Sequence, residues 1–403
     1  MKVLLEYFMK IKYNKLRISY ERKFSLRYLF AKFADFVRES DKILLSLLFL
    51  AAGYGCIAVF SATNYMESLR PFLIHTACLI AGFGVIIVVS IFDYARYIKV
   101  WPLFAILGII PVLLTFFIGY APAGTDDKAW LNLGFTTFQP SELLKICFVI
   151  TFSYHLAKAG KDINKFKKLI PICVHGMIPV VLIHLQGDDG TALVFAVMFV
   201  LMLWAAGVSW KYFAAAFTSL LVASPIIYFF IMNDTQRERL INMFNIDADI
   251  KGVGWQQYRG RQALANGGIF GQGYLNGELT QMGKSGVPEG HNDFIFVTIG
   301  EELGFLGCML VIIILAAICI RCLQVAKLST KSEGKYICVG IFAMLFAQIV
   351  INIGMCTSIT PVIGVTLPFF SAGGTSLICL FLGLALVHNV YMNRNSRIIH
   401  LKD

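Results

Sequence analysis

Asp293 is the ionisable residue whose place in the sequence best suits acid–base chemistry. It lies in residues 288–307, PEGHNDFIFVTIGEELGFLG, a stretch that begins polar and then turns apolar. A carboxylate at such a boundary can ionise in contact with water and still meet a molecule held in lipid. Asp293 is therefore a candidate general base toward a hydroxyl, and His291 beside it is a candidate substrate contact.

Helical spacing along this stretch predicts how Asp293 is oriented. At 100° per residue, Asp293, Gly300 and Gly304 fall within about 20° of one line. Two glycines four residues apart favour close helix contact, so Asp293 should point toward the interior of a helix bundle. Glu302 would lie on the opposite side and about 13 Å deeper. We expect Glu301 and Glu302 to be structural and bonded to neighbouring helices.

A second group of charges opens another apolar run, QPSELLK at residues 139–145. Glu142 and Lys145 are three residues apart and share a helix face, where each can neutralise the other. A charge inside a spanning helix costs about 2.5 to 3.5 kcal/mol, so something must offset it. Two readings stay open: an ion pair that joins helices, or a site for an anionic lipid head group in which Glu142 orients Lys145. Pro140 and Ser141 also suit a helix start, with Ser141 or Glu142 on free backbone N–H groups.

Three other segments place polar or irregular residues near predicted helix ends. Trp130, in AWLNLG, suits an interfacial aromatic belt better than a substrate contact, and both readings stay open. Asp188 and Asp189, in QGDDGTA, are expected to cap the following helix, because carboxylates favour helix N-termini. The apolar but Pro- and Gly-rich residues 360–376 predict a non-helical element that lines an outward-facing cavity. The predicted roof of that cavity is Ser371, Gly373 and Gly374.

Composition indicates which elements must position these residues. The chain has 403 residues, of which 58% are hydrophobic and 15% charged, and its mean hydropathy is +0.72. This balance is far from that of a soluble protein and predicts an all-α, polytopic integral membrane protein. About ten apolar runs are long enough to span a bilayer as helices. They lie near residues 43–62, 72–92, 100–120, 139–157, 169–185, 190–207, 210–232, 293–320, 336–357 and 372–391.

The placement of basic residues predicts the topology. Most of the 35 Lys and Arg residues fall in the N-terminal segment and in short loops on one side, which the positive-inside rule assigns to the cytoplasm together with both termini. The large loop 233–292 is predicted to be extracellular. The net charge of +11 follows from this rule and from anionic inner-leaflet lipid, so no nucleic-acid partner is implied. The predicted domains are a cytoplasmic basic tail (1–42), a transmembrane domain (43–393) and a cytoplasmic C-terminal tail (394–403).

Four long motifs, in this order, resemble the SEDS family, which includes RodA, FtsW and SpoVE of bacterial cell-wall synthesis. They are WLNLGFTTFQPSELLK, QGDDGTA, GGIFGQG followed by VPEGHNDFIFVTIGEELGFLG, and NIGMCTSITPVIGVTLPFFSAGGTS. The resemblance covers about residues 43 to 393. The QRER run at 236–239, GYLNGELTQ and VTLPFFSAGGTS are more similar to RodA than to FtsW.

The chain departs from the family pattern at four places, none of which removes an ionisable residue of a motif. The family commonly has His-Thr-Asp, QPDLGTA, a Gln-Ser pair before the glycine-rich turn, and a glycine near residue 358. This chain has His291-Asn292-Asp293, Gly187 with Asp189, Arg259-Gly260, and Ser358 at those places. The departures bear on substrate contacts of the outer loop.

The resemblance implies a glycosyltransferase that polymerises lipid II into glycan strands at the outer face of the bacterial cytoplasmic membrane and releases undecaprenyl diphosphate. It implies Asp293 as the catalytic base. Positive charge must stabilise the leaving diphosphate, with Lys145 as the first candidate and Arg239 as the second. Glu142 would hold Lys145, and Trp130 would pack on sugar or lipid. A divalent cation, Mg or Mn, on the diphosphate is compatible with this chemistry, but no ligand cluster demands one and no metal ligand is assigned.

The implied partners are a class B penicillin-binding protein, which is a transpeptidase, and the cell elongation machinery. Three alternatives stay open: a lipid II flippase, a membrane scaffold without chemistry of its own, and an FtsW-like paralogue for division or sporulation. A flippase needs charges along a path, whereas a polymerase needs a base at one surface. The ionisable residues cluster at the predicted outer face, which favours the polymerase.

Overall fold

The structure is a computed structural model that describes residues 36–66, 68–121, 127–132, 134, 137–244 and 254–394. The predicted N-terminal tail lies outside the described residues as far as residue 35, and the C-terminal tail does so from residue 395. Residues 245–253 of the large loop lie outside them as well.

Helices dominate the described chain, because a segment in a bilayer must satisfy its own backbone hydrogen bonds. Nine helices of the described part are long and apolar enough to cross a membrane, and α9 is a shorter apolar helix. The all-α polytopic prediction is confirmed, and each predicted span overlaps one helix. The nine long helices and the shorter α9 are α3 (Lys42–Ala62), α4 (Arg70–Ser90), α6 (Trp101–Ile118), α7 (Pro140–Ala159), α8 (Phe166–Leu185), α9 (Asp189–Ala205), α10 (Trp210–Ile226), α13 (Ile295–Leu328), α14 (Ser332–Cys356) and α15 (Thr375–Met392).

Shorter elements connect these helices. A small antiparallel pair, β1 and β2, precedes α7, and the large loop contributes α11 and α12. A π-helical turn, η2, extends α10. The bounds are α5 (Tyr94–Lys99), β1 (Leu131–Asn132), β2 (Thr137–Phe138), η1 (Gly160–Asp162), η2 (Ile227–Ile231), α11 (Asp234–Phe244), α12 (Trp255–Gly267) and η4 (Thr280–Ser285).

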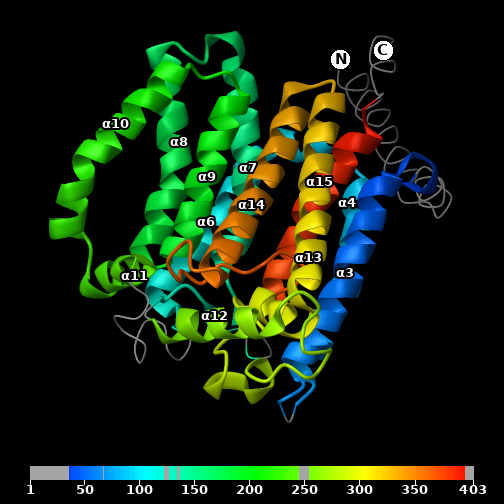
Figure 1. The fold of residues 1–403 in the computed structure, drawn as a ribbon. Coiled ribbons are helices and arrows are strands. Elements are labelled where there is room, and N and C mark those ends of the chain that lie inside the picture. The colour runs from blue at the N-terminus through cyan, green and yellow to red at the C-terminus, as the bar shows by residue number, and fades with distance from the viewer. Residues whose placement is uncertain are drawn as a thin grey trace, which may run out of the picture.

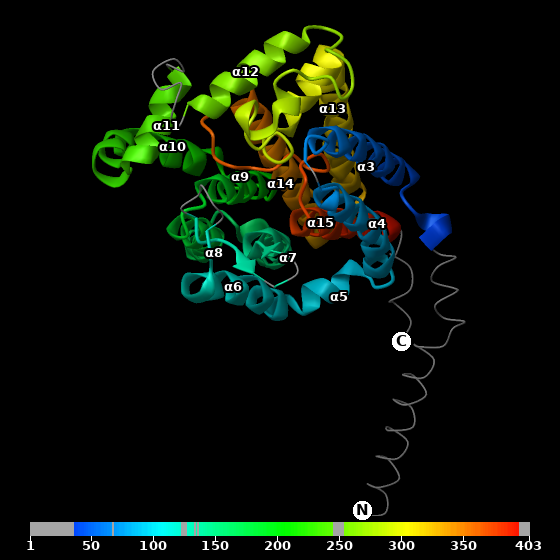
Figure 2. The ribbon, with the colours of Figure 1, turned by 90° about the horizontal axis from the view of Figure 1, so that it is seen from below.

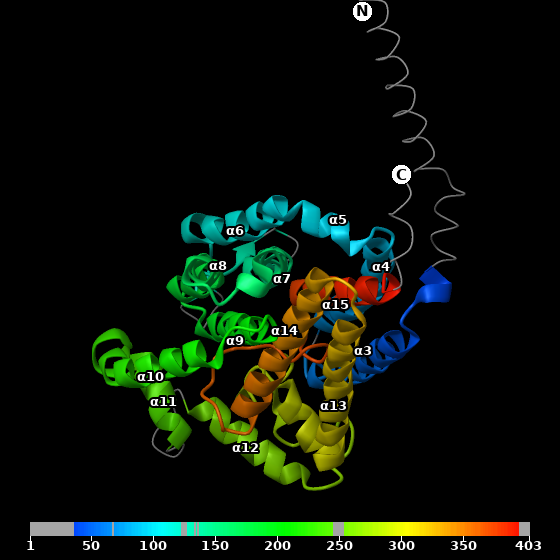
Figure 3. The same ribbon diagram turned by 90° about the horizontal axis from the view of Figure 1, so that it is seen from above.

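The long helices stand side by side as a bundle with two distinct ends (Figure 1). Helix α3 begins and α15 ends at one end, here called the terminal end, whereas α11 and α12 lie at the opposite end, the loop end (Figure 1). Seen along the bundle, α14 lies centrally and α10 lies at the edge (Figures 2 and 3). In α14, 72% of the apolar stretch that could span the membrane is buried inside the protein, whereas in α10 the share is 0%. Helix α14 is therefore part of the rigid framework on which a site can be built.

A buried ion pair fastens the terminal end. Asp41, the N-cap of α3, accepts hydrogen bonds from the guanidinium of Arg321 on α13, with Nε 2.8 Å from Oδ2. His388 on α15 accepts from the backbone N–H of Asp41 at 3.3 Å and bonds to the hydroxyl of Ser90 on α4 at 3.0 Å. Helices α3, α4, α13 and α15 are therefore joined at the terminal end.

Helix α13 is broken near its start, and the helical spacing assumed from the sequence does not hold there. Gly304 has φ 67° and ψ −165°, so helical spacing does not continue through it. The helix begins at Ile295, so Asp293 precedes it. The predicted line through Asp293, Gly300 and Gly304 is therefore wrong, because Asp293 lies before the helix and Gly304 interrupts it.

The glycine-rich turn after α12 fills the break. Backbone N–H groups of Gln272 and Gly273 donate to the carbonyl oxygens of Glu301 and Glu302 at 2.9 and 3.0 Å. In return, the N–H of Phe305 donates to a carbonyl oxygen of the turn at 2.9 Å. Backbone groups that the break frees are thus satisfied by the turn, as burial requires. The GGIFGQG motif is explained by this close backbone approach.

Glu301 and Glu302 are structural, as predicted, but their partners are loop groups rather than neighbouring helices alone. Glu301 is fully buried and accepts from the backbone N–H groups of Leu279 and Thr280 at 3.0 and 2.7 Å. Glu302 accepts from Leu275 N–H at 3.2 Å and from the side chain of Gln281, as well as from Ser61 on α3. Hydrogen bonds to a buried carboxylate offset its desolvation, so the two glutamates hold the large loop against α13.

We expect Gly304→Ala to destabilise the fold. The backbone conformation of Gly304 is one that only glycine adopts readily, and a Cβ there would lie 2.5 Å from the carbonyl oxygen of Ile269. Such strain costs about 1 to 3 kcal/mol before any clash is counted. The measurement is the midpoint of thermal unfolding in detergent. Gly84→Ala on α4 is the matched control, since its Cβ meets nothing within 4 Å and helical alanine is favoured. An unchanged midpoint for Gly304→Ala would contradict the role assigned to the break.

Candidate functional site

Asp293 lies at the loop end, between the large loop and α14. Its carbonyl oxygen accepts a hydrogen bond from Asn352 Nδ2 at 2.8 Å and from Cys356 Sγ at 3.6 Å. Its carboxylate faces the non-helical segment after α14, since a Cβ at Gly364 would lie 3.5 Å from Asp293 Oδ2. The residue as a whole is half-buried. The backbone of Asp293 is therefore fixed by α14, and its carboxylate lies beside the non-helical segment.

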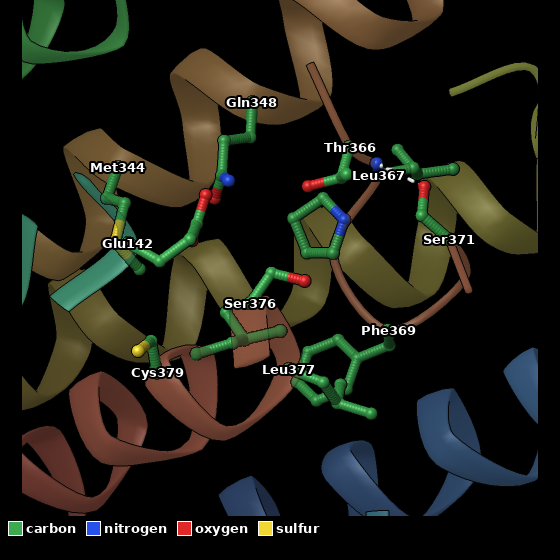
Figure 4. A pocket seen from close by; sticks show the side chains of 12 residues that line it. Glu142, Met344, Gln348, Thr366, Leu367, Phe369, Ser371, Ser376, Leu377 and Cys379 are labelled. Carbon is green, nitrogen blue, oxygen red and sulfur yellow. Dashed lines mark hydrogen bonds between the residues drawn. The ribbon is translucent and has the colours of Figure 1, made fainter. Parts of the chain in front are cut away.

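The predicted non-helical element is present as residues 357–374, between α14 and α15. Ser371 Oγ accepts from the N–H of Leu367 at 2.7 Å (Figure 4). It also donates to the carbonyl oxygen of Asn292 at 2.8 Å. The N–H of Ala372 donates to the carbonyl oxygen of His291 at 2.9 Å. Ser371 thus ties the segment to the residues just before Asp293, which is a positioning contact.

Burial raises the pKa of Asp293 to about 7, and the negative charges of Glu289 and Asp188 act in the same direction. A carboxyl group with a pKa near neutrality is partly ionised at pH 7. It binds a proton more strongly than an ordinary aspartate does, which suits a general base.

Asp188 belongs to the same electrostatic group as Asp293. It is buried, and its carboxylate caps α9 by accepting from Thr191 N–H at 2.9 Å, as predicted. It also accepts from Gln139 Nε2 at 2.9 Å. Burial raises the pKa of Asp188 to about 6, and among the smaller effects the positive charge of Lys145 opposes this. The sequence indicated the cap but not the link to Asp293, which depends on how α9 packs.

The predicted pair of Glu142 and Lys145 forms within α7, with Nζ 2.8 Å from Oε1 and both side chains buried. The pocket beside Glu142 has a volume of about 20 Å³, which is room for a single water. Figure 4 shows Glu142 and Gln348 pointing toward one another across this pocket. The predicted capping at this helix start is absent, because Gln139 is the N-cap without a side-chain bond and Ser141 Oγ has no partner among the described residues.

A second, larger cavity has a volume of about 320 Å³, and two residues that directly precede Asp293 line it. His291 and Asn292 line it, and Gly373 and Gly374 form part of its wall, as predicted for the cavity roof. Sequence reasoning missed Asn352, Gln139, Arg70 and His75 at these sites. Asn352 and Gln139 could have been found from the sequence, because a polar amide in or beside an apolar run needs a hydrogen-bond partner once it is buried.

Two predicted site residues lie apart from these contacts. Trp130 is half-buried, and its backbone pairs with Tyr120 before α7. Arg239 is half-buried on α11, and it forms no ion pair with a described residue. In the part of the chain that the structure describes, no group of three or more His, Cys, Asp or Glu side chains is placed to hold a metal ion.

Comparisons with known proteins agree in family and in fold. The family profile described as "Cell cycle protein", which comprises FtsW, RodA and SpoVE, matches residues 41–396. The chain is 30% identical to "Peptidoglycan glycosyltransferase MrdB" of Escherichia coli K12, over 90% of this chain and 96% of that protein. It is 28% identical to "Stage V sporulation protein E" of Bacillus subtilis 168, over 87% of this chain and 96% of that protein.

Two solved structures share the fold. One, described as "Structural coordination of polymerization and crosslinking by a peptidoglycan synthase complex", matches with a TM-score of 0.77 and 23% identity, over 88% of this chain and 98% of that one. The crystal structure of the Thermus thermophilus rod shape determining protein RodA matches with a TM-score of 0.65 and 21% identity, over the same shares of the two chains.

We expect the buried pair in α7 to show strong energetic coupling. Glu142→Leu or Lys145→Met alone leaves a buried charge without its partner, which costs about 3 to 5 kcal/mol. The double variant removes both charges and should unfold at a higher temperature than either single variant. The measurement is a double-mutant cycle of thermal unfolding midpoints.

The surface pair of Asp162 and Lys165 is the matched control. It has the same 2.8 Å distance and the same spacing, but both side chains are exposed. Solvent screens such a pair, so its neutralisation should change stability little. Additive losses in the α7 cycle would show that Glu142 and Lys145 are not coupled.

Proposed function

This chain belongs to the family of FtsW, RodA and SpoVE, and from that membership and the geometry around Asp293 we propose that it polymerises lipid II into glycan strands. It is a multi-pass membrane protein and a peptidoglycan glycosyltransferase. The observation that carries the mechanism is a carboxyl group with a raised pKa, whose backbone is held by α14 and directly follows two residues that line a cavity.

The proposed reaction transfers a glycan from one diphosphate to a sugar hydroxyl. The hydroxyl oxygen of the acceptor sugar forms a bond to the anomeric carbon of the donor. The bond from that carbon to the phosphate oxygen breaks, and its electron pair leaves with undecaprenyl diphosphate. Asp293 takes the proton of the attacking hydroxyl. A pKa near 7 supports this role, because a base is most effective when its pKa lies near the working pH.

The leaving diphosphate requires positive charge where its negative charge develops. Lys145 stays our first candidate and Arg239 the second, with Glu142 orienting the lysine. Lys145 is only 2% exposed, so the helices around it must separate before a diphosphate touches the ammonium. A divalent cation would add charge at the diphosphate, but the described carboxylates form no cluster for one, and no step depends on it.

The remaining contacts follow from the placement of the loop end. We propose that the loop end faces the outside of the bacterial cytoplasmic membrane and that both termini are cytoplasmic, as the basic residues indicate. His291 and Trp130 would then meet the sugar or lipid portion of lipid II. The proposed partner is a class B penicillin-binding protein of the elongation machinery, since one structural neighbour is described as a synthase complex that coordinates polymerization and crosslinking.

Asp293→Asn should abolish polymerisation and leave the fold intact. The amide keeps the shape of the side chain but cannot accept the proton. The assay is conversion of lipid II to glycan strands by the purified chain with its cognate class B penicillin-binding protein, and the thermal unfolding midpoint checks the fold. Full polymerisation by the variant would remove Asp293 as the base. Movement of labelled lipid II across sealed vesicles without polymer would favour a flippase instead.

The rate should depend on the ionisation of Asp293. Because the base must be unprotonated, kcat/KM should fall as the pH drops below about 7, the pKa that burial gives Asp293. Glu289→Gln removes a neighbouring negative charge, so the pKa of Asp293 should fall and the acid limb of the profile should move to lower pH. The amide oxygen of that variant can still accept from Asn292, as the carboxylate of Glu289 does at 2.7 Å. Exposed Glu278→Gln on the same loop is the control. Superimposable profiles for the Glu289 variant and the wild type would contradict the assignment of this pKa.

A further inference from the structure

A cavity of about 50 Å³ lies between α6, α7 and α8 and takes no part in the proposed mechanism. Helices α6 and α8 both pack against α7 and make few contacts with one another, so they form the two walls of a groove whose floor is α7 (Figures 2 and 3). The cavity is lined by apolar side chains of all three helices, among them Ile109, Phe148 and Ile178, and by the polar Thr151 and His175. Because Ile178 is exposed at the surface of the bundle, the groove faces the acyl chains of the membrane.

A pair of histidines joins α7 to α8 beside this cavity. Nδ1 of His155 on α7 lies 3.1 Å from Nδ1 of His175 on α8, and the two rings stack. Nε2 of His175 lies 3.2 Å from Oγ1 of Thr151, whereas Nε2 of His155 has no partner among the described residues. A neutral imidazole has one donor and one acceptor nitrogen. When His155 accepts from His175, its Nε2 is therefore an N–H donor available to a ligand.

The terminal end of the groove is strongly basic. Residues 158–168, which connect α7 to α8 at this end (Figure 1), contain five lysines and one acidic residue, Asp162. Asp162 is already paired with Lys165 at 2.8 Å. Lys158 and Lys168 are exposed and form no ion pair with a described residue, and the positive charges of both act on His155. An anion beside His155 would offset the repulsion between these like charges.

Aromatic rings indicate that these lysines lie at the depth of lipid head groups. Trp101, in the first turn of α6, stacks on Tyr154 of α7 with ring centroids 5.3 Å apart. Nζ of Lys158 lies 5.8 Å from the centroid of the Tyr154 ring. Trp and Tyr concentrate where acyl chains meet head groups. Thr151, at the cavity, precedes Lys158 by seven residues and so lies about 10 Å deeper along α7.

We propose that this groove binds one anionic phospholipid of the leaflet at the terminal end. Its phosphate would contact Lys158, Lys168 and Nε2 of His155, and part of one acyl chain would enter the cavity between α6 and α8. A phosphate oxygen accepts hydrogen bonds from ammonium and imidazole alike, and basic pockets between spanning helices suit anionic head groups. A zwitterionic lipid is disfavoured, because it brings a further cation to the lysines. The site lies apart from Asp293 and does not depend on the proposed function.

Native mass spectrometry of the full chain in detergent, titrated with dioleoyl phosphatidylglycerol or dioleoyl phosphatidylcholine, tests the proposal. Phosphatidylglycerol should bind more tightly. The double variant Lys158→Gln/Lys168→Gln should weaken its binding about tenfold or more, because each lysine near an anionic lipid contributes a factor of about five. Lys327→Gln/Lys331→Gln is the matched control, since it removes two exposed lysines from the connection between α13 and α14.

Two histidine variants separate a ligand from a packing residue. His155→Phe keeps an aromatic ring but has no N–H for a phosphate, so the affinity for phosphatidylglycerol should fall severalfold. His175→Phe breaks the same bond between the rings but leaves Nε2 of His155 in place. It should lower the thermal unfolding midpoint and keep most of the lipid affinity. Equal losses of affinity in the two variants would overturn the assignment of His155 as a ligand.

Phosphatidylglycerol should also raise the thermal unfolding midpoint of the wild type, because a ligand that binds only the folded state stabilises it. It should not do so for the Lys158 and Lys168 double variant. Equal affinities for the two lipids, or equal losses in the two lysine double variants, would overturn the proposal, since binding would then follow only the total charge of the chain. An equal rise of the midpoint with inorganic phosphate would exclude the lipid as the specific ligand.

Discussion

The hydrogen bonds that hold the backbone beside Asp293 are the constraint on which the site depends. Asn352 donates to the carbonyl oxygens of both Asp293 and Val365, at 2.8 and 2.7 Å. Ser371 and Ala372 add bonds to the two preceding residues. Such bonds need carbonyl groups that no helix uses, so the chain must be non-helical on both sides of the contact. Irregular backbone at this depth is tolerated because it is buried in protein and lines a cavity.

A second set of hydrogen bonds fixes the large loop against α13. Two buried side chains, Glu301 and Glu302, accept hydrogen bonds from backbone N–H groups and from polar side chains. Such bonds satisfy polar groups that burial removes from water. The break at Gly304 makes this arrangement possible, since it brings the glycine-rich turn into bonding distance of the helix backbone. The loop is thereby tied to the helix that Asp293 precedes.

The helices and the ion pair in α7 were predictable because both follow from short-range rules: apolar length for a span, and three-residue spacing for Glu142 and Lys145. The break in α13 was not, since nothing local to Gly304 distinguishes a packing glycine from a kink until the turn at Gly271 is known to approach it. The cavity lining was missed for the same reason, because Arg70, Thr137 and His291 are distant in sequence. The departure at Ser358 is consistent with the resemblance, because its φ of 62° is a conformation that glycine adopts freely.

The buried pair of Glu142 and Lys145 in α7 is linked electrostatically to Asp293 through Asp188. Asp188 raises the pKa of Asp293, and Lys145 acts on Asp188 in the opposite direction. The buried positive charge of Lys145 favours the ionised form of Asp188, and burial weakens the screening of this effect by solvent. The buried pair of Lys145 and Glu142 therefore also contributes to the electrostatic group that raises the pKa of Asp293 through Asp188.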